Sequence, residues 1–232
     1  LDRSSAASDV YKRQGQLLQG ALMTVQLACA ALVCGLALGL LLAACQLSRR
    51  AALRRPVAVL TGVLRGVPEF LVVLVCYFGL SNLINNHFDS AFDISPFFAG
   101  VVSLALVLGA YASEVFRGSF LALERGQLEA ARSLGMTPSQ TFFLIRLPQA
   151  WRIAIPSLGN LWQSLLKDTS LVSVVGLEDL LKKSNMAAQA SHQPFLFLLA
   201  AALMYFCLLA MSDPVVAALE RRVQRPYLAH RS

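Results

Sequence analysis

Long runs of apolar residues, separated by short polar stretches, make up most of the chain from Leu17 onward. A helix needs about 20 apolar residues to cross a bilayer core of about 30 Å. The run that contains Arg65-Gly66-Val67-Pro68-Glu69 is interrupted there, and its start is the boundary that the pattern defines least well. The pattern predicts membrane-spanning helices at 17–45, 56–80, 97–116, 153–175 and 195–219.

A polar segment between the third and fourth runs, at about 124–148, has the start and stop signals of two short helices. Gly135 can adopt the left-handed conformation that ends a helix, and Thr137-Pro138-Ser139-Gln140 offers an N-cap, a first-position proline and a capping-box glutamine. We expect Glu129 at the start of the first helix, where it complements the dipole, and Pro148 at the end of the second. Such a hairpin is suited to docking a soluble partner, and an ordinary interfacial hairpin is the alternative.

The composition supports an all-α integral membrane protein. Of 232 residues, 56% are hydrophobic and only 14% are charged, which lies outside the range of soluble globular domains. The net charge of +7 does not indicate nucleic-acid binding, because Lys and Arg lie in the short stretches between apolar runs. Basic residues in such stretches determine membrane topology.

The positions of the basic residues predict an N-terminus outside and a C-terminus in the cytoplasm. The stretch 48–55 is strongly basic and is therefore cytoplasmic, whereas the loop with His87, Asp89 and Asp93 lacks Lys and Arg and faces out. Lys182 and Lys183 fall on the outer side, accompanied by Glu178 and Asp179. The hairpin and the tail return to the cytoplasm with Arg117, Arg125, Arg132, Arg146, Arg152, Arg221, Arg222, Arg225 and Arg231.

The chain is predicted to hold one transmembrane domain, at 15–226, followed by a cytoplasmic tail at 227–232. Residues 1–14 are polar and lack an apolar core preceded by positive charge, so they do not form a signal peptide. We interpret them as a non-native or disordered leader, with a genuine extramembrane tail as the alternative.

An intramembrane enzyme or a metal site is not indicated. An enzyme needs a nucleophile with a base, or metal ligands, on facing helices. His87 and His192 fall in outward loops and His230 in the tail. The cysteines form no CxxC pair and are expected to be small buried hydrophobes; they are Cys29, Cys34, Cys45, Cys76 and Cys207.

The hairpin resembles the coupling loop of the permease subunits of ABC importers. The pattern is EAA, three residues, Gly, and later a hydrophobic residue, any residue, Leu and Pro. In this chain its members are Glu129, Ala130, Ala131, Gly135, Leu147 and Pro148. In that family the loop docks in a cleft of the ATP-binding subunit and passes its motion to the transmembrane helices.

The resemblance extends over about 16–224 and is specific to the polar amino-acid branch, most of all the histidine, arginine, lysine and ornithine permeases. The segments that carry it are 18–24, 65–69, 109–118, 166–173, 176–179 and 219–222. Val67 departs from the family, many members of which have Thr there, so a hydroxyl contact at this position would be absent.

The resemblance implies a type I ABC-importer permease fold in the bacterial plasma (inner) membrane, crossing it several times. It implies import of amino acids, with basic ones preferred, and three kinds of partner: a dimer of ATP-binding subunits, a second identical or similar permease subunit, and an extracytoplasmic amino-acid-binding protein. ATP and Mg²⁺ would be bound by the ATP-binding subunit, because this chain contains no G-x-x-x-x-G-K-[ST] phosphate loop. The alternative is a non-transporting membrane scaffold or sensor.

Ionisable residues inside membrane spans are costly and suggest function. Glu69, Glu114, Lys167 and Asp168 are therefore candidates for the substrate pathway, and a scaffold would have no reason to keep them. Structural alternatives are a helix-start carboxylate for Glu69, an i,i+3 pair of Glu114 with Arg117, and a self-neutralising Lys167–Asp168 arrangement that holds helices together. Asp213-Pro214 in the last run is unusual for the family, and a kink in the helix is the simplest interpretation.

Overall fold

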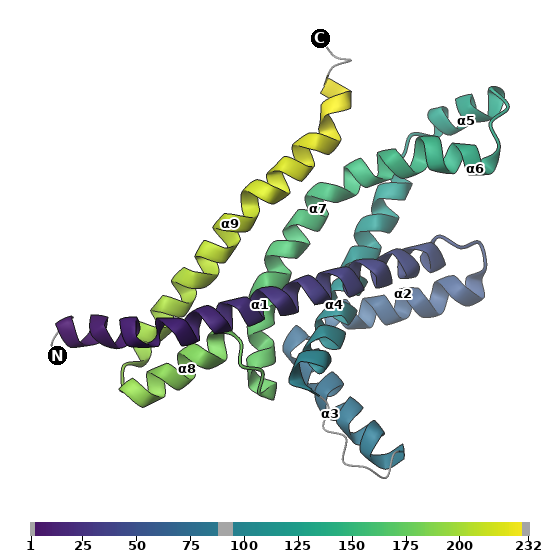
Figure 1. The fold of residues 1–232 in the computed structure, drawn as a ribbon. Helices are drawn as coiled ribbons and strands as arrows, with labels where there is room; N and C mark the ends of the chain where they lie inside the picture. Colours follow the sequence, from purple (N-terminus) through teal and green to yellow (C-terminus); the bar gives the residue numbers. More distant parts are fainter. Residues whose placement is uncertain (1–2, 88–94, 229–232) are drawn as a thin grey trace.

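The computed structural model describes the backbone of residues 3–87 and 95–228 and the side chains of residues 14–82 and 95–224. These residues form helices joined by short turns (Figure 1). In chain order the elements are α1 (Arg3–Gln46), α2 (Ala51–Gly66), α3 (Glu69–His87), α4 (Pro96–Leu121), α5 (Arg125–Ser133), α6 (Pro138–Thr141), the π-helical η1 (Phe142–Arg146), α7 (Leu147–Asp168), the 3₁₀-helical η2 (Thr169–Val175), α8 (Leu180–Ser191) and α9 (Pro194–Leu228). Asp89, Asp93 and His230 and the side chains of His87, Arg225 and Arg231 lie outside the described residues.

Three helices in the described part of the chain are long and apolar enough to cross a membrane. They are Gln14–Gln46 of α1, the whole of α4 and Pro194–Gln224 of α9. Helices α2 and α3 meet at 110° and reach that length and hydropathy only as one broken span. Helix α7, in the fourth predicted run, is more polar, since Arg152, Lys167 and Asp168 interrupt its apolar sequence.

The predicted interruption of the second run is confirmed as the corner between α2 and α3. Val67 is extended, with φ −92° and ψ 140°, as expected for a residue whose helical conformation is disfavoured by a following proline. Glu69 opens α3, where its carboxylate lies in the first turn and complements the helix dipole. The start of the second helix is at Ala51, before the predicted boundary, because Pro56 is tolerated within α2.

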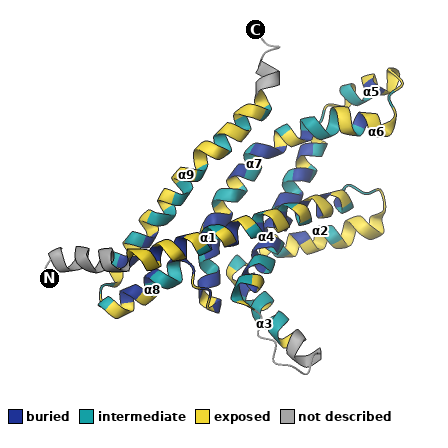
Figure 2. Ribbon diagram, viewed as in Figure 1, coloured by how far each residue is buried: buried dark blue, intermediate teal, exposed yellow. Residues whose placement is uncertain are grey.

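Helix α1 crosses α4, and this is the most extensive helix pairing in the fold (Figure 1). The two backbones approach closely at Gly39, which has no side chain. A Cβ there would lie only 2.7 Å from the Cβ of Ala112. Small residues at crossings are how membrane helices gain packing contacts. The buried positions in Figure 2 concentrate where α1, α4 and α7 meet, around Leu27, Leu104 and Leu165.

The exposed surface of α9 is largely apolar. Exposed side chains on α9 include Leu203, Phe206 and Met211, and the same face is largely exposed in Figure 2. Cys29, Cys34 and Cys207 are exposed as well, so the expectation that they are buried is wrong for these three. The apolar runs correctly predicted that these cysteines have apolar surroundings. On the outer face of a membrane protein, however, such surroundings are supplied by lipid or by a neighbouring chain.

Helix α8, which the sequence pattern did not indicate, packs against α1 and α9. The buried carboxylate of Asp179 caps it by accepting a 2.9 Å hydrogen bond from the backbone N–H of Lys182. Tyr205 on α9 donates to the other carboxylate oxygen at 3.3 Å, and the backbone N–H of Leu180 donates to Thr24 on α1 at 3.2 Å. Glu178, predicted to accompany the lysines, forms an ion pair with Lys183 at 3.4 Å.

Candidate functional site

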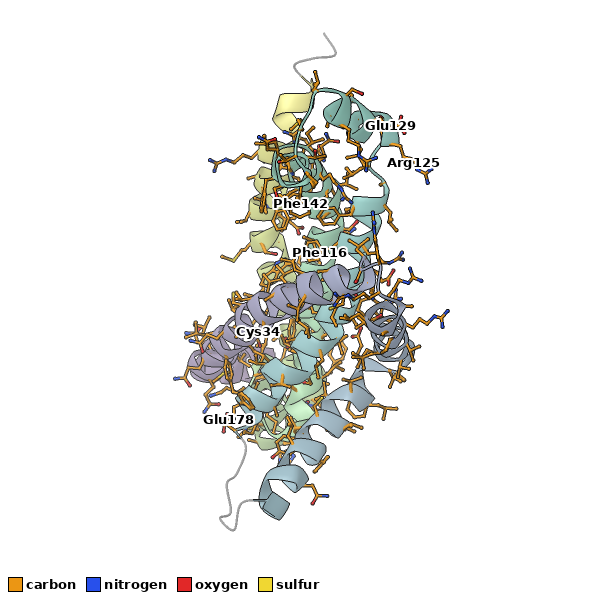
Figure 3. All side chains as sticks on the ribbon, turned by 90° about the vertical axis from the view of Figure 1, so that its right-hand side faces the viewer. Cys34, Phe116, Arg125, Glu129, Phe142 and Glu178 are labelled. Carbon is orange, nitrogen blue, oxygen red and sulfur yellow. The ribbon has the colours of Figure 1, made fainter. Side chains whose placement is uncertain are left out.

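The predicted hairpin, formed by α5, α6 and η1, projects from one end of the helix assembly (Figure 1). Figure 3 shows Arg125 and Glu129 on α5 pointing outward, at the end of the molecule opposite Glu178. Both side chains are exposed. The hairpin is therefore accessible to a soluble partner.

The turn between the two short helices has the predicted geometry. Gly135 has φ +73°, and the N–H groups of Gly135 and Met136 donate to the carbonyls of Arg132 and Ala131, which is a Schellman motif. The capping box is confirmed by reciprocal hydrogen bonds. Thr137 N–H donates to Gln140 Oε1 at 2.9 Å, and Gln140 N–H donates to Thr137 Oγ1 at 3.3 Å.

Two expectations about the hairpin are wrong. Glu129 lies in the middle of α5, not at its start, because Glu124 is the extended N-cap residue and the helix already begins at Arg125. Pro148 does not end the second helix but sits in the first turn of α7. The π-helical η1 makes this possible: the N–H of Leu147 bonds to the carbonyl of Phe142, five residues back, so the helical path continues through a proline that lacks an N–H.

The predicted motif residues therefore occupy different environments. Glu129 and Ala130 are exposed on α5, Ala131 is 2% exposed and packs into the hairpin, and Leu147 and Pro148 are partly buried at the start of α7. A Cβ on Gly135 would meet no atom within 4 Å. The glycine is required there for its backbone conformation, not for space.

A second candidate site is a hollow of about 250 Å³ between α3, α4 and α7. Glu69 and Asp168 line it together with Tyr111 and Ser164, over a floor of leucine and valine side chains. Two carboxylates on an apolar floor form a setting that attracts a cation and excludes bulk water from part of it. Of the four predicted pathway residues, the structure brings these two together.

Glu114 and Lys167 do not line this hollow. Glu114 forms the predicted i,i+3 pair with Arg117 at 2.6 Å and is also 3.6 Å from Arg65 on α2, a link between helices that the sequence did not indicate. Lys167 is exposed. A Lys167–Asp168 pair is not among the ion pairs of the described side chains.

Asp213 has a partner on another helix. Its carboxylate accepts a 2.9 Å hydrogen bond from Gln163 Nε2 on α7, and α9 continues as one helix past Pro214. Such bonds between membrane helices stabilise their association by about 0.6 kcal/mol on average. The unusual Asp213 is thus explained by its contact with α7.

A larger hollow of about 420 Å³ lies between α1, α7 and α9. Apart from Ser212, it is lined by apolar side chains and cysteine, among them Leu32, Ile155 and Val216. It offers no charge to a polar ligand. The smaller hollow with two carboxylates is therefore the better candidate for binding one.

Comparison with known families and sequences gives a consistent result. Residues 35–225 match the family described as "Binding-protein-dependent transport system inner membrane component". The chain is 38% identical over 217 residues to the histidine/lysine/arginine/ornithine transport system permease protein HisQ of Salmonella typhimurium, covering 92% of this chain and 95% of that protein. It is 38% identical to the arginine ABC transporter permease protein ArtQ of Haemophilus influenzae, with coverage of 90% and 94%. It is 42% identical to the nopaline transport system permease protein NocQ of Agrobacterium fabrum, with coverage of 85% and 86%.

Solved structures with a similar fold include a crystal structure of an amino acid ABC transporter with histidines. Its chain superposes with a TM-score of 0.84 at 30% identity, covering 96% of this chain and 99% of that one. An inward-facing structure of the MetNI methionine ABC transporter superposes with a TM-score of 0.74 at 16% identity, covering 91% and 98%, which shows a shared fold alone.

Proposed function

Since the chain belongs to the family of binding-protein-dependent transport system inner membrane components, we propose that it is the permease subunit of an ABC transporter that imports amino acids. It lies in the bacterial inner membrane, which several of its helices cross. The observation that carries the proposal is the exposed hairpin with the EAA, Gly and Leu-Pro pattern, on a fold shared with an amino acid ABC transporter. Relatives named as amino-acid permeases over nearly their whole length support it.

In this proposal the hairpin receives the motion of the ATP-binding subunit and transmits it to the transmembrane helices. Glu129 and Ala130 on its exposed face, with Ala131 and Gly135 holding its shape, dock in the ATP-binding subunit. Leu147 and Pro148 carry the motion into α7, because the helical path from α6 through η1 to α7 is continuous. In this proposal the hairpin lies in the cytoplasm and the N-terminus outside, and the chain crosses the membrane five times, with the broken α2–α3 pair and α7 counted as two of the crossings.

The hollow with Glu69 and Asp168 is the proposed substrate pathway, and a basic amino acid is the proposed cargo. Two carboxylates there would attract its ammonium or side-chain cation, and Arg65 does not compete because it pairs with Glu114. Lys167, next to Asp168 on α7, would attract the cargo's carboxylate, whereas Glu114 on α4 is paired with Arg65 and Arg117. The named substrates of the relatives, histidine, lysine, arginine and ornithine, agree with a cationic cargo.

A second permease subunit, identical or similar, completes the pathway in this proposal. The hollow holds about 250 Å³, below the roughly 300–1,000 Å³ of typical ligand pockets, and it is open on one side. The exposed apolar face around it would be covered by that subunit or by lipid. Two ATP-binding subunits bind below, and an amino-acid-binding protein delivers the cargo from outside.

The proposal is tested by assembling the chain with its cognate subunits and binding protein in liposomes and measuring uptake of arginine, histidine, ornithine and glutamine. Uptake that requires both ATP and the binding protein is the expected result. Binding of both partners without uptake of any amino acid would contradict the proposal and favour a scaffold or sensor.

A further inference from the structure

The guanidinium of Arg146, at the end of η1, is incompletely paired. Its Nε is buried, and no hydrogen-bond acceptor for it lies within the described part of the chain. The guanidinium carbon lies 5.8 Å from the centre of the Phe120 ring, which in turn stacks on Phe142 at 5.9 Å. Phe120 therefore lies against one face of the guanidinium, and Nε is left without an acceptor.

Arg146 also lines a hollow inside the hairpin. The hollow has a volume of about 140 Å³ and is lined by Leu128, Arg132, Met136, Pro138, Thr141 and Arg146. Two arginines therefore share it, and no acidic side chain is among its lining residues. The nearest candidates in sequence, Glu124 and Glu129, form no ion pair with either arginine among the described side chains.

Arg146 owes its position to the π-helical turn. In an uninterrupted α-helix each residue turns 100° from the last, and one wider turn shifts everything before it relative to α7. Single π turns are found preferentially at functional sites. Here the π turn allows the helical path to continue through Pro148. Arg146, the last residue of this turn, contacts Phe120 and lines the hollow.

We propose that this hollow receives the carboxylate of an Asp or Glu side chain of the ATP-binding subunit, held by hydrogen bonds from Arg146 and Arg132. The inference rests on the proposed function, since it presumes that the hairpin docks on that subunit. Arg132 and Arg146 line the hollow without an acidic side chain to balance their charge, and hydrogen bonds between a guanidinium and a carboxylate are among the strong ones. A carboxylate fits because its two oxygens match the fork of a guanidinium.

The binding test compares Arg146→Gln with Arg54→Gln in the complete transporter. Both variants remove one positive charge, but Arg54 is exposed on α2, outside the docking hairpin, and does not line the hollow. Loss of a charged hydrogen bond should weaken binding of the ATP-binding subunit by about ten-fold to a hundred-fold in Arg146→Gln. Arg54→Gln should change this binding far less. Arg132→Gln, at an exposed position, should also weaken binding, even if Arg146→Gln lowers the yield of folded permease.

The chemical test uses Arg146→Lys, which places an amine at the hollow. A carbodiimide joins an amine to a carboxylate only where the two are in contact, so it should cross-link this variant to the ATP-binding subunit. Mass spectrometry then identifies the Asp or Glu. Arg54→Lys, which places an amine on α2 outside the hairpin, is the matched control.

The outcomes separate this inference from the proposed function. Cross-linking above the control supports a partner carboxylate. Unchanged binding in both Arg146→Gln and Arg132→Gln, or absence of the cross-link, would overturn the inference. In those cases coupled uptake by the native chain, lost in Gly135→Val, would still uphold the docking hairpin.

Discussion

At the scale of single residues, Asp179 is an acidic group outside the spans that is buried and hydrogen-bonded on both carboxylate oxygens. It is fully buried, and this burial raises the pKa of Asp179 from 3.8 to about 6, although hydrogen bonds from the backbone and from Tyr205 oppose the rise. The folded chain therefore binds this proton more tightly than the unfolded chain. This group's contribution to stability is largest at low pH and is lost as the pH rises from 3.8 to about 6.

Asp179→Asn should keep the cap on α8 while removing the buried charge. At neutral pH we expect its thermal stability in detergent to equal or exceed that of the native chain, and its dependence on pH through this range to flatten. Asp179→Ala, which removes the cap, should cost about 1 kcal/mol. A variant with Asn that is less stable than the one with Ala would contradict this assignment.

The carboxylates of the hollow between α3, α4 and α7 give a second prediction at this scale. Asp168→Asn and Glu69→Gln should each raise the concentration of arginine needed for half-maximal uptake by about ten-fold, as expected for loss of one charged contact. Uptake of an uncharged amino acid should change less. Glu114→Gln is the control, because Glu114 pairs with Arg65 and Arg117 and does not line the hollow. An equal loss in all three variants would argue against direct contact.

Sequence reasoning located single residues well where the interaction is local. The turn at Gly135, the capping box of Thr137 and the Glu114–Arg117 pair each depend on residues within one turn of helix. The links from Arg65 to Glu114 and from Gln163 to Asp213 were missed. These join residues that only the packing of whole helices brings together.

At the scale of elements, the crossing of α1 and α4 depends on a glycine. A side chain on Gly39 would overlap Ala112, so the two helices would have to separate. Gly39→Val should therefore lower stability by about 1–3 kcal/mol, the usual cost of overpacking. Gly62→Val on α2 is the control, because a Cβ there meets nothing within 4 Å. Thermal unfolding in detergent measures both, and equal stabilities would show that the crossing tolerates the added side chain.

Sequence reasoning mispredicted two elements, each for its own reason. Pro148 was expected to stop a helix because the rule for proline presumes an α-helical path, and the π-helical η1 provides another. Helix α8 was missed because its residues fall between apolar runs and were interpreted as a connection. The apolar runs themselves predicted α1, α4 and α9 because length and hydropathy are properties of the sequence alone.

At the scale of the whole molecule, α7 connects the hairpin to the proposed substrate pathway. The hairpin lies at one end of the molecule, and α8 and Glu178 lie at the other (Figures 1 and 3). Helix α7 begins at the hairpin and ends at Asp168, which lines the hollow with Glu69. Motion of the hairpin would thus reach a carboxylate of the proposed pathway through one helix. No sequence pattern could indicate this connection, because it depends on where α7 ends relative to α3 and α4.

The most direct test of this account is the activity of the complete transporter in liposomes with Gly135→Val. A β-branched residue is strongly disfavoured at φ +73°, so the turn of the hairpin should be distorted while the spans remain intact. Gly126→Val, at a helical position of the same hairpin with open space around it, is the control. We expect Gly135→Val to assemble in the membrane but to lose ligand-stimulated ATP hydrolysis and uptake together, while Gly126→Val retains both. Normal coupled uptake by Gly135→Val would contradict the assignment of this hairpin as the coupling element.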